Sequence, residues 1–167
     1  MKQMVENVSK IKIVVGLGNP GPEYKNTYHN AGFLFIDYMK DKLYDPKFHI
    51  VKSGVFMNDS GLSVKKFLKK YGFKRDNLLI AHDDSDILLG EYKLSFDRGA
   101  AGHKGVASVI NNVGGKEFWR LRIGVRRADE RKQASEFVLK KIGKADMNTL
   151  EQTFKEIISS EELFLKE

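Results

Sequence analysis

The stretch IKIVVGLGNPGP, residues 11–22, decides the fold of this 167-residue chain. Its first part, Ile11 to Val15, is apolar at four of five positions, which is typical of a buried strand. Its second part, Gly16 to Pro22, contains two of the three prolines in the chain, so the strand is expected to end in a rigid loop. Loops at the carboxyl ends of strands commonly carry functional residues in α/β folds.

Strand and helix patterns alternate along the rest of the chain. Strands are predicted at 48–51, 78–81, 91–96 and 119–125, and helices at 33–43, 60–71, 106–113 and around Leu150, with Asn148 as a candidate cap. The fold class is therefore α/β: a single-domain three-layer globule with a twisted mixed, mostly parallel sheet flanked by helices. Residues 1–167 are expected to form this one domain, with 1–9 as a candidate flexible leader.

Composition excludes several kinds of protein. A hydrophobic fraction of 41% is too high for a disordered chain, and no apolar run is long enough to cross a bilayer. The chain has no cysteine, which excludes disulfides, thiolate zinc sites and cysteine nucleophiles. Its four histidines are widely scattered in the sequence, so no metal site is expected. The polar N-terminus lacks an apolar signal core, and a cytoplasmic location follows by default.

The net charge of +7 is unevenly distributed. Residues 63–75 contain six basic and no acidic residues, which fits either a solvated lysine face or a surface for polyanions. Residues 116–144 contain ten basic and four acidic residues. This second block places five arginines close to two aromatic residues: Arg120, Arg122, Arg126, Arg127 and Arg131, with Phe118 and Trp119. Because guanidinium groups beside rings are typical of phosphate and base contacts, we expect nucleic-acid binding at 116–144.

The glycines Gly16, Gly18 and Gly21 match the dinucleotide-binding fingerprint in spacing. That fingerprint requires a helix whose N-terminus meets the pyrophosphate. Pro20 and Pro22 predict a turn here instead, and no helix pattern begins before about Asn30. A nucleotide-cofactor enzyme is therefore a minor alternative.

Polar residues that suit acid–base chemistry follow the apolar segments. They are Asn19, His29, Asn58, Asp83 and His103. A histidine can take a proton from water near neutral pH, and a carboxylate on its other nitrogen orients it and stabilises the imidazolium. Asparagine can bind a peptide group without adding charge. Each of these residues also has a purely structural interpretation, because asparagine is common in turns and a lone histidine is more often structural.

Several motifs together resemble the bacterial peptidyl-tRNA hydrolase family. In chain order they are Gly16-Leu17-Gly18-Asn19-Pro20-Gly21, Glu23-Tyr24, Thr27-Tyr28-His29-Asn30-Ala31-Gly32, Phe56-Met57-Asn58-x-Ser60-Gly61, His82-Asp83, Gly102-His103-x-Gly105, Phe118-x-Arg120-Leu121-Arg122-Ile123-Gly124 and Phe137-Val138-Leu139. The resemblance covers about residues 11–160. It implies an enzyme that hydrolyses the ester between a peptide and the 3′-terminal ribose of tRNA.

The resemblance also implies roles for individual residues. His29 is the expected general base on water, Asp83 its orienting carboxylate, and Asn19 and Asn58 the amides that bind the peptidyl group. The expected substrate and tRNA contacts are Tyr24, Phe56, Met57, Lys93, His103, Lys104, Arg122 and Arg131. The implied partner is peptidyl-tRNA, bound at its acceptor stem and 3′ end by a monomer, with neither DNA nor a membrane and without cofactor or metal.

Three features depart from the family pattern. Lys104 stands where asparagine is usual, Tyr28 replaces an arginine, and the region 44–53 is shorter than expected, with a strand pair truncated. The first and third motivate an alternative hypothesis, a tRNA-binding relative with weakened catalysis.

Overall fold

Four parallel strands and one antiparallel edge strand make the central sheet of the computed structural model, which describes residues 8–43 and 45–160. The strands are β1 (Ile13–Gly16), β2 (His49–Lys52), β3 (Leu78–Leu88), β4 (Tyr92–Phe96) and β5 (Trp119–Arg126). Their order is β2-β1-β3-β5-β4, and only the β4–β5 pair is antiparallel within the described residues. The predicted mixed, mostly parallel sheet is confirmed.

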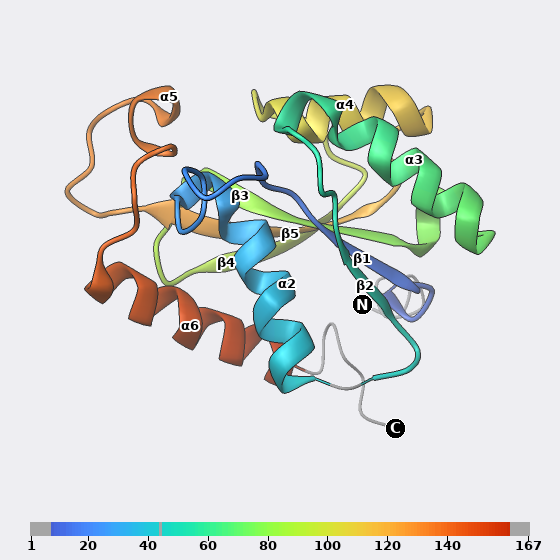
Figure 1. The fold of residues 1–167 in the computed structure, drawn as a ribbon, viewed down its shortest axis with the longest axis horizontal. Helices are drawn as coiled ribbons and strands as arrows, with labels where there is room; N and C mark the ends of the chain where they lie inside the picture. Colours follow the sequence, from blue (N-terminus) through green and yellow to red (C-terminus); the bar gives the residue numbers. More distant parts are fainter. Residues whose placement is uncertain (1–7, 44, 161–167) are drawn as a thin grey trace.

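Helices cover both faces of this sheet (Figure 1). The helices α2 (Ala31–Lys42) and α6 (Lys144–Ser159) pack on one face, where Phe35 and Phe154 lie in the larger core. The helices α3 (Ser60–Tyr71) and α4 (Lys104–Val113) cover the other face over a second core around Val64 and Val109. Short elements complete the chain: η1 (Tyr28–Asn30), η2 (Met57–Asp59), η3 (Arg75–Asn77) and α5 (Ala134–Phe137). The three-layer expectation is confirmed.

The glycine-rich loop after β1 forms a turn, as the prolines predict. Gly21 adopts a φ of +109°, and the next helical residues after β1 are those of η1. A helix N-terminus for a pyrophosphate therefore does not follow β1 within the described chain.

Other predicted segments begin or end at different residues in the structure. The strand predicted at 78–81 continues through the polar run His82 to Asp86, because the backbone of His82, Asp83 and Asp84 pairs with β5. Helix α6 begins at Lys144 after Gly143, so Asn148 lies inside it and is not its cap. Val8, within the candidate leader, is buried in the core, while residues 1–7 lie outside the described residues.

The region 44–53 contributes a single described strand, β2, at the edge of the sheet next to β1. None of the helices in the described ranges is long and apolar enough to cross a membrane.

Helices α3 and α4 approach each other closely at Gly61. A Cβ atom on Gly61 would overlap the backbone carbonyl of Ser108, while Ser108 Oγ accepts a hydrogen bond of 2.9 Å from Gly61 N. Glycine is therefore required here by the backbone of a neighbouring helix rather than by a turn.

We expect Gly61→Ala to lower the free energy of unfolding by about 2 kcal/mol, because overlap with a rigid backbone outweighs the higher helix propensity of alanine. Urea unfolding followed by circular dichroism measures this difference. Gly99→Ala is the matched control, since no heavy atom lies within 4 Å of the position of its added Cβ. Equal stability of Gly61→Ala and the wild type would contradict the close packing.

Candidate active site

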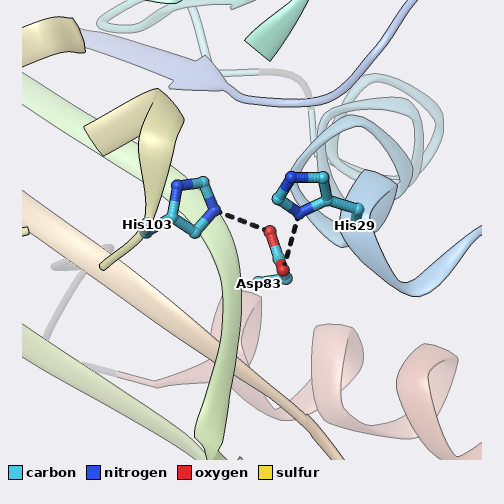
Figure 2. Close-up of side chains that lie close together, drawn as sticks. All are labelled: His29, Asp83 and His103. Carbon is cyan, nitrogen blue, oxygen red and sulfur yellow. Dashed lines mark hydrogen bonds and ion pairs between the residues drawn. The ribbon is translucent and has the colours of Figure 1, made fainter. Parts of the chain in front are cut away.

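The centre of the site is the buried carboxylate of Asp83 on β3, which contacts two imidazoles (Figure 2). Oδ2 of Asp83 lies 2.9 Å from Nδ1 of His29, and its Oδ1 lies 2.8 Å from Nε2 of His103. Figure 2 shows the two rings on either side of the carboxylate. Three residues that are distant in the sequence therefore form one hydrogen-bonded group.

The partners of Asp83 keep it ionised. Burial raises the pKa of Asp83, but electrostatic attraction to His103 and His29 and the hydrogen bonds from both rings lower it more, so the net result is a pKa below the ordinary value. An ionised carboxylate only accepts hydrogen bonds, so both imidazole nitrogens that face it carry protons.

The ring of His103 is oriented with Nε2 toward Asp83 and Nδ1 toward helix α4. Its Nδ1 accepts a hydrogen bond of 3.2 Å from the backbone N–H of Val106 and thereby caps the N-terminus of α4. If Nδ1 were protonated, its N–H would face the backbone N–H of Val106 at the positive end of a helix, which is unfavourable. The tautomer of His103 is thus determined by the helix on one side and by Asp83 on the other.

His29 differs because its second ring nitrogen is free. With Nδ1 donating to Asp83, Nε2 has a lone pair and no hydrogen-bond partner among the described residues. Burial lowers the pKa of His29, and Lys104 lowers it further, but the charge of Asp83 and the hydrogen bond to it raise it more. His29 is therefore a base whose proton affinity is raised above the ordinary value.

A third imidazole, that of His82, lies beside His103 with ring centroids 4.8 Å apart. Its Nδ1 donates to the backbone carbonyl of Asp83 at 2.7 Å, and its buried Nε2 has no partner among the described groups. Burial and the neighbouring His103 lower the pKa of His82 well below the ordinary value, so the ring is neutral. The fold therefore brings together three of the four histidines that are widely scattered in the sequence.

The ligand-type atoms of His29, Asp83 and His103 lie within 4.8 Å of one another, a grouping that could also hold a metal ion. In the observed arrangement the ring nitrogens and carboxylate oxygens are at hydrogen-bond distances, and a cation would have to displace both hydrogen bonds. Catalysis without a metal remains a prediction.

The backbone places His29 against Asp83. Its N–H donates to the carbonyl of Val138 at 2.7 Å, which ties η1 to the segment after α5. A Cβ on Gly32 would overlap backbone atoms of Ala81 and Leu17, so only glycine allows the start of α2 to lie this close to β3 and to the residue after β1. The motif that contains His29 is thus built around a close backbone approach.

Asn19 is oriented by two neighbours. Its backbone N–H and C=O exchange hydrogen bonds of 2.8 and 2.9 Å with the side chain of Asn30, and its Oδ1 accepts from Met57 N at 2.8 Å. Oδ1 of Asn19 therefore already accepts a hydrogen bond, whereas neither N–H of its Nδ2 group donates in any described hydrogen bond. Sequence reasoning missed the role of Asn30, although its place directly after His29 was a usable signal.

The predicted contacts at the substrate end lie next to this amide. Tyr24 and Phe56 pack edge to face with ring centroids 5.9 Å apart, and Phe56 is 51% exposed. Asn58 is exposed on η2 beside Met57, and its backbone carbonyl accepts from Ser108 Oγ at 2.7 Å. The Asn58 side chain has no described partner, so its substrate role remains a prediction.

A cleft of about 360 Å³ opens beside the imidazoles. The residues that line it include His29, Asp83, His103, Lys104, Ser135 and Leu139. Lys104 is the first residue of α4, is exposed, and has no ion-pair partner among the described residues. A lysine at the positive end of a helix is electrostatically unfavourable, and it adds positive charge to the cleft.

The arginine block 116–144 is largely occupied by contacts within the protein, which corrects the expectation of an aromatic and arginine surface. Phe118 and Trp119 are buried. Arg120 is also buried, which lowers its pKa to about 10, and it donates to Gly99 O. Arg122 Nε pairs with Asp84 Oδ2 at 2.7 Å.

Further basic groups of this block bind backbone carbonyls. Arg126 donates to the carbonyls of Ser85, Glu130 and Lys132. Lys141 Nζ donates to the carbonyls of Pro22, Glu23 and Lys25. These residues stabilise loops around the site, which leaves less of the block available for phosphates than its composition indicates.

Two predicted tRNA contacts remain exposed. Lys93 lies on β4 directly opposite Arg122 of β5, and Arg131 lies in the loop before α5, where its guanidinium donates to Ala128 O. Neither lines the cleft beside His29. Their contact with tRNA, like that of Arg122, remains a prediction.

The geometry predicts opposite shifts of the His29 pKa in two variants. Lys104→Gln removes a neighbouring positive charge and should raise the pKa of His29, whereas Asp83→Asn removes the stabilising carboxylate and should lower it. Titration of the imidazole followed by NMR measures both. Lys155→Gln on α6 is the charge-matched control and should leave the value unchanged; shifts of the same sign in both variants would contradict the arrangement.

Comparison with known proteins shows the family of this chain. The profile of the family described as "Peptidyl-tRNA hydrolase" matches residues 13–167. The peptidyl-tRNA hydrolase of Mycoplasma mycoides subsp. mycoides SC is 35% identical over 162 residues, which span 86% of this chain and 87% of the relative. That of Hahella chejuensis is 35% identical over 164 residues, with 86% and 84% covered.

A solved structure gives the same result. The crystal structure of peptidyl-tRNA hydrolase from Acinetobacter baumannii superimposes with a TM-score of 0.77 at 34% identity, covering 90% of this chain and 86% of that one. With the sequence match across nearly the whole domain and the same fold, this chain belongs to the peptidyl-tRNA hydrolase family.

Proposed function

We propose that this protein hydrolyses the ester bond between a peptide and the 3′-terminal ribose of tRNA, releasing free tRNA and the peptide. The observation that carries the proposal is the 2.9 Å hydrogen bond from His29 Nδ1 to Asp83, which leaves Nε2 as a base beside a cleft. Membership in the family supports the substrate.

In the proposed reaction, His29 Nε2 takes a proton from a water molecule as the water oxygen attacks the ester carbonyl carbon. Asp83 stabilises the imidazolium that forms. When the tetrahedral intermediate collapses, the bond to the ribose 3′-oxygen breaks, and the imidazolium returns its proton to that oxygen. The products are a peptide with a free carboxyl group and a tRNA with a free 3′-hydroxyl.

Asn19 suits the recognition of a peptidyl group. Because Met57 N occupies its Oδ1, the free Nδ2 donors fit a peptide carbonyl. A site that hydrogen-bonds a particular polar group discriminates strongly against substrates that lack it, so this amide favours peptidyl esters over free aminoacyl esters.

We further propose that the enzyme acts as a monomer in the cytoplasm on the acceptor stem and 3′ end of peptidyl-tRNA, without cofactor or metal. The alternative of a weakened tRNA-binding relative rested on Lys104 and on the short 44–53 region. The His29–Asp83 pair and the orientation of Asn19 are both intact, so no observation favours that alternative.

The first test is the release of N-acetylated amino acid from N-acetyl-aminoacyl-tRNA. We expect Asp83→Asn to lower kcat by about 10²–10⁴-fold, because the amide neither stabilises the imidazolium nor raises the basicity of His29, with little change in tRNA affinity. Asp41→Asn on the surface of α2 is the control. Equal background-level release by the wild type and His29→Ala, with tRNA still bound, would support the weakened relative instead.

The second test concerns Asn19→Asp. This change keeps the oxygen that accepts from Met57 N but replaces the Nδ2 donors, so the fold should persist while the preference for N-acetyl-aminoacyl over free aminoacyl esters falls about tenfold or more. The ratio of kcat/KM values for the two esters measures it. Asn111→Asp on the exposed side of α4 is the control, and an unchanged ratio would assign the discrimination to another group.

A further inference from the structure

The outer side of α3 carries only positive charge. Four exposed lysines lie on the helix and a fifth follows it, and we call this set the basic face: Lys65, Lys66, Lys69, Lys70 and Lys74. None of the five has an ion-pair partner in the described part of the chain. Their charge is therefore uncompensated at the surface.

The long helices α2 and α6 mix their charges, whereas α3 does not. Helix α2 exposes Asp37 and Asp41 beside Lys40 and Lys42, and α6 intersperses lysines with glutamates. On α3 the pairs 65/69 and 66/70 set like charges one turn apart, which destabilises a helix. A helix face that is only solvated gains nothing from this repulsion. A surface that binds a polyanion, in contrast, requires the concentrated positive charge.

Aromatic rings adjoin the basic face. His49 of β2 stacks on Tyr71 at 4.1 Å between ring centroids, and Phe73 lies 6.0 Å beyond Tyr71. Lys70 lies over the ring of Tyr71 at 5.2 Å, and Lys12 lies over Phe73 at 5.9 Å. Basic groups interleaved with rings are typical of single-stranded and backbone contacts with nucleic acid.

This surface is separate from the catalytic cleft. His49 is the first residue of β2, and Tyr71 and Phe73 precede β3, so the rings lie at the amino ends of the parallel strands. Asp83 lies in β3 beyond the point where β1 ends. In Figure 1 the end of α3 and the start of β2 lie on the right, away from α5 and the start of α4.

We propose that the basic face of α3, with the adjoining rings of His49, Tyr71 and Phe73, binds the phosphate backbone of RNA at a second point outside the cleft. The arginines Arg120, Arg122 and Arg126 of 116–144 are bound to internal acceptors, so they offer less free charge to phosphates than the basic face does. The apolar side of α3, with Val64 and Leu68, is buried in the core, so this helix cannot insert into a lipid surface. That the RNA is the substrate tRNA rests on the proposed function.

The test compares two charge-matched quadruple variants of the whole protein. One replaces Lys65, Lys66, Lys69 and Lys70 by glutamine; the control replaces Lys40, Lys42, Lys144 and Lys155 on α2 and α6. Uncharged tRNA affinity is measured by fluorescence anisotropy at several salt concentrations. We expect the α3 variant to bind tRNA about tenfold or more weakly at low salt. The slope of the logarithm of the association constant against the logarithm of the salt concentration should be smaller in magnitude by about 3, because each lost phosphate contact lowers it by about 0.9.

Hydrolysis separates this surface from the chemistry. The α3 variant should raise KM for N-acetyl-aminoacyl-tRNA but leave kcat/KM for the N-acetyl-aminoacyl ester of adenosine within about twofold of wild type, because that ester reaches only the cleft. The double variant Lys66→Gln, Lys70→Gln repeats the comparison with less disturbance of the helix.

Equal loss of affinity in both quadruple variants, or none in either, overturns the proposal. So does charge-dependent binding to phosphatidylserine vesicles with tRNA affinity unchanged. If the wild type hydrolyses neither ester, the proposed function fails instead, while the anisotropy comparison still decides whether α3 binds RNA.

Discussion

The two hydrogen bonds to the buried carboxylate of Asp83 are the interaction on which the rest of the site depends. A buried charge is costly unless it is paired and hydrogen-bonded, and here two imidazole N–H groups meet that need. Because a carboxylate only accepts, this arrangement determines the tautomers of both rings. His103 uses its other nitrogen to cap α4, so His29 alone presents a free lone pair to the cleft. One buried charge thus determines which of two similar imidazoles keeps a free lone pair.

The fold brings these groups together through the ends of parallel strands. Strand β3 continues past the end of β1, and this places Asp83 beside the loop that follows β1. Gly32 allows the start of α2 to approach β3 and the end of β1, and the hydrogen bonds exchanged between Asn19 and Asn30 join the loop to the turn that carries His29. The base and the candidate amide for the peptidyl group are therefore held by one connected set of backbone contacts.

Charge is divided between two regions with different roles. The arginines of 116–144 look like a nucleic-acid surface in composition, yet Arg120, Arg122 and Arg126 satisfy carbonyls and a carboxylate around the site. The lysines of α3 look like an ordinary solvated face, yet they keep their charge uncompensated among the described residues. Guanidinium groups are suited to internal hydrogen bonding by their planar array of donors, whereas ammonium groups on long stems remain in water.

Local patterns in the sequence were sufficient for the α/β class, the mixed sheet and the turn after β1, because apolar periodicity and proline act over a few residues. The motifs were also sufficient to single out His29, Asp83 and Asn19. They failed where long-range partners overrule local polarity: His82 to Asp86 looked like a loop and is part of β3, and the histidines looked scattered although three of them meet. Which nitrogen of His29 is free, which atom of Asn19 is left without a partner, and which basic residues are neutralised depend on contacts between residues far apart in the chain. Only the tertiary structure decided these, because a hydrogen bond requires a distance and a direction that spacing along a sequence does not contain.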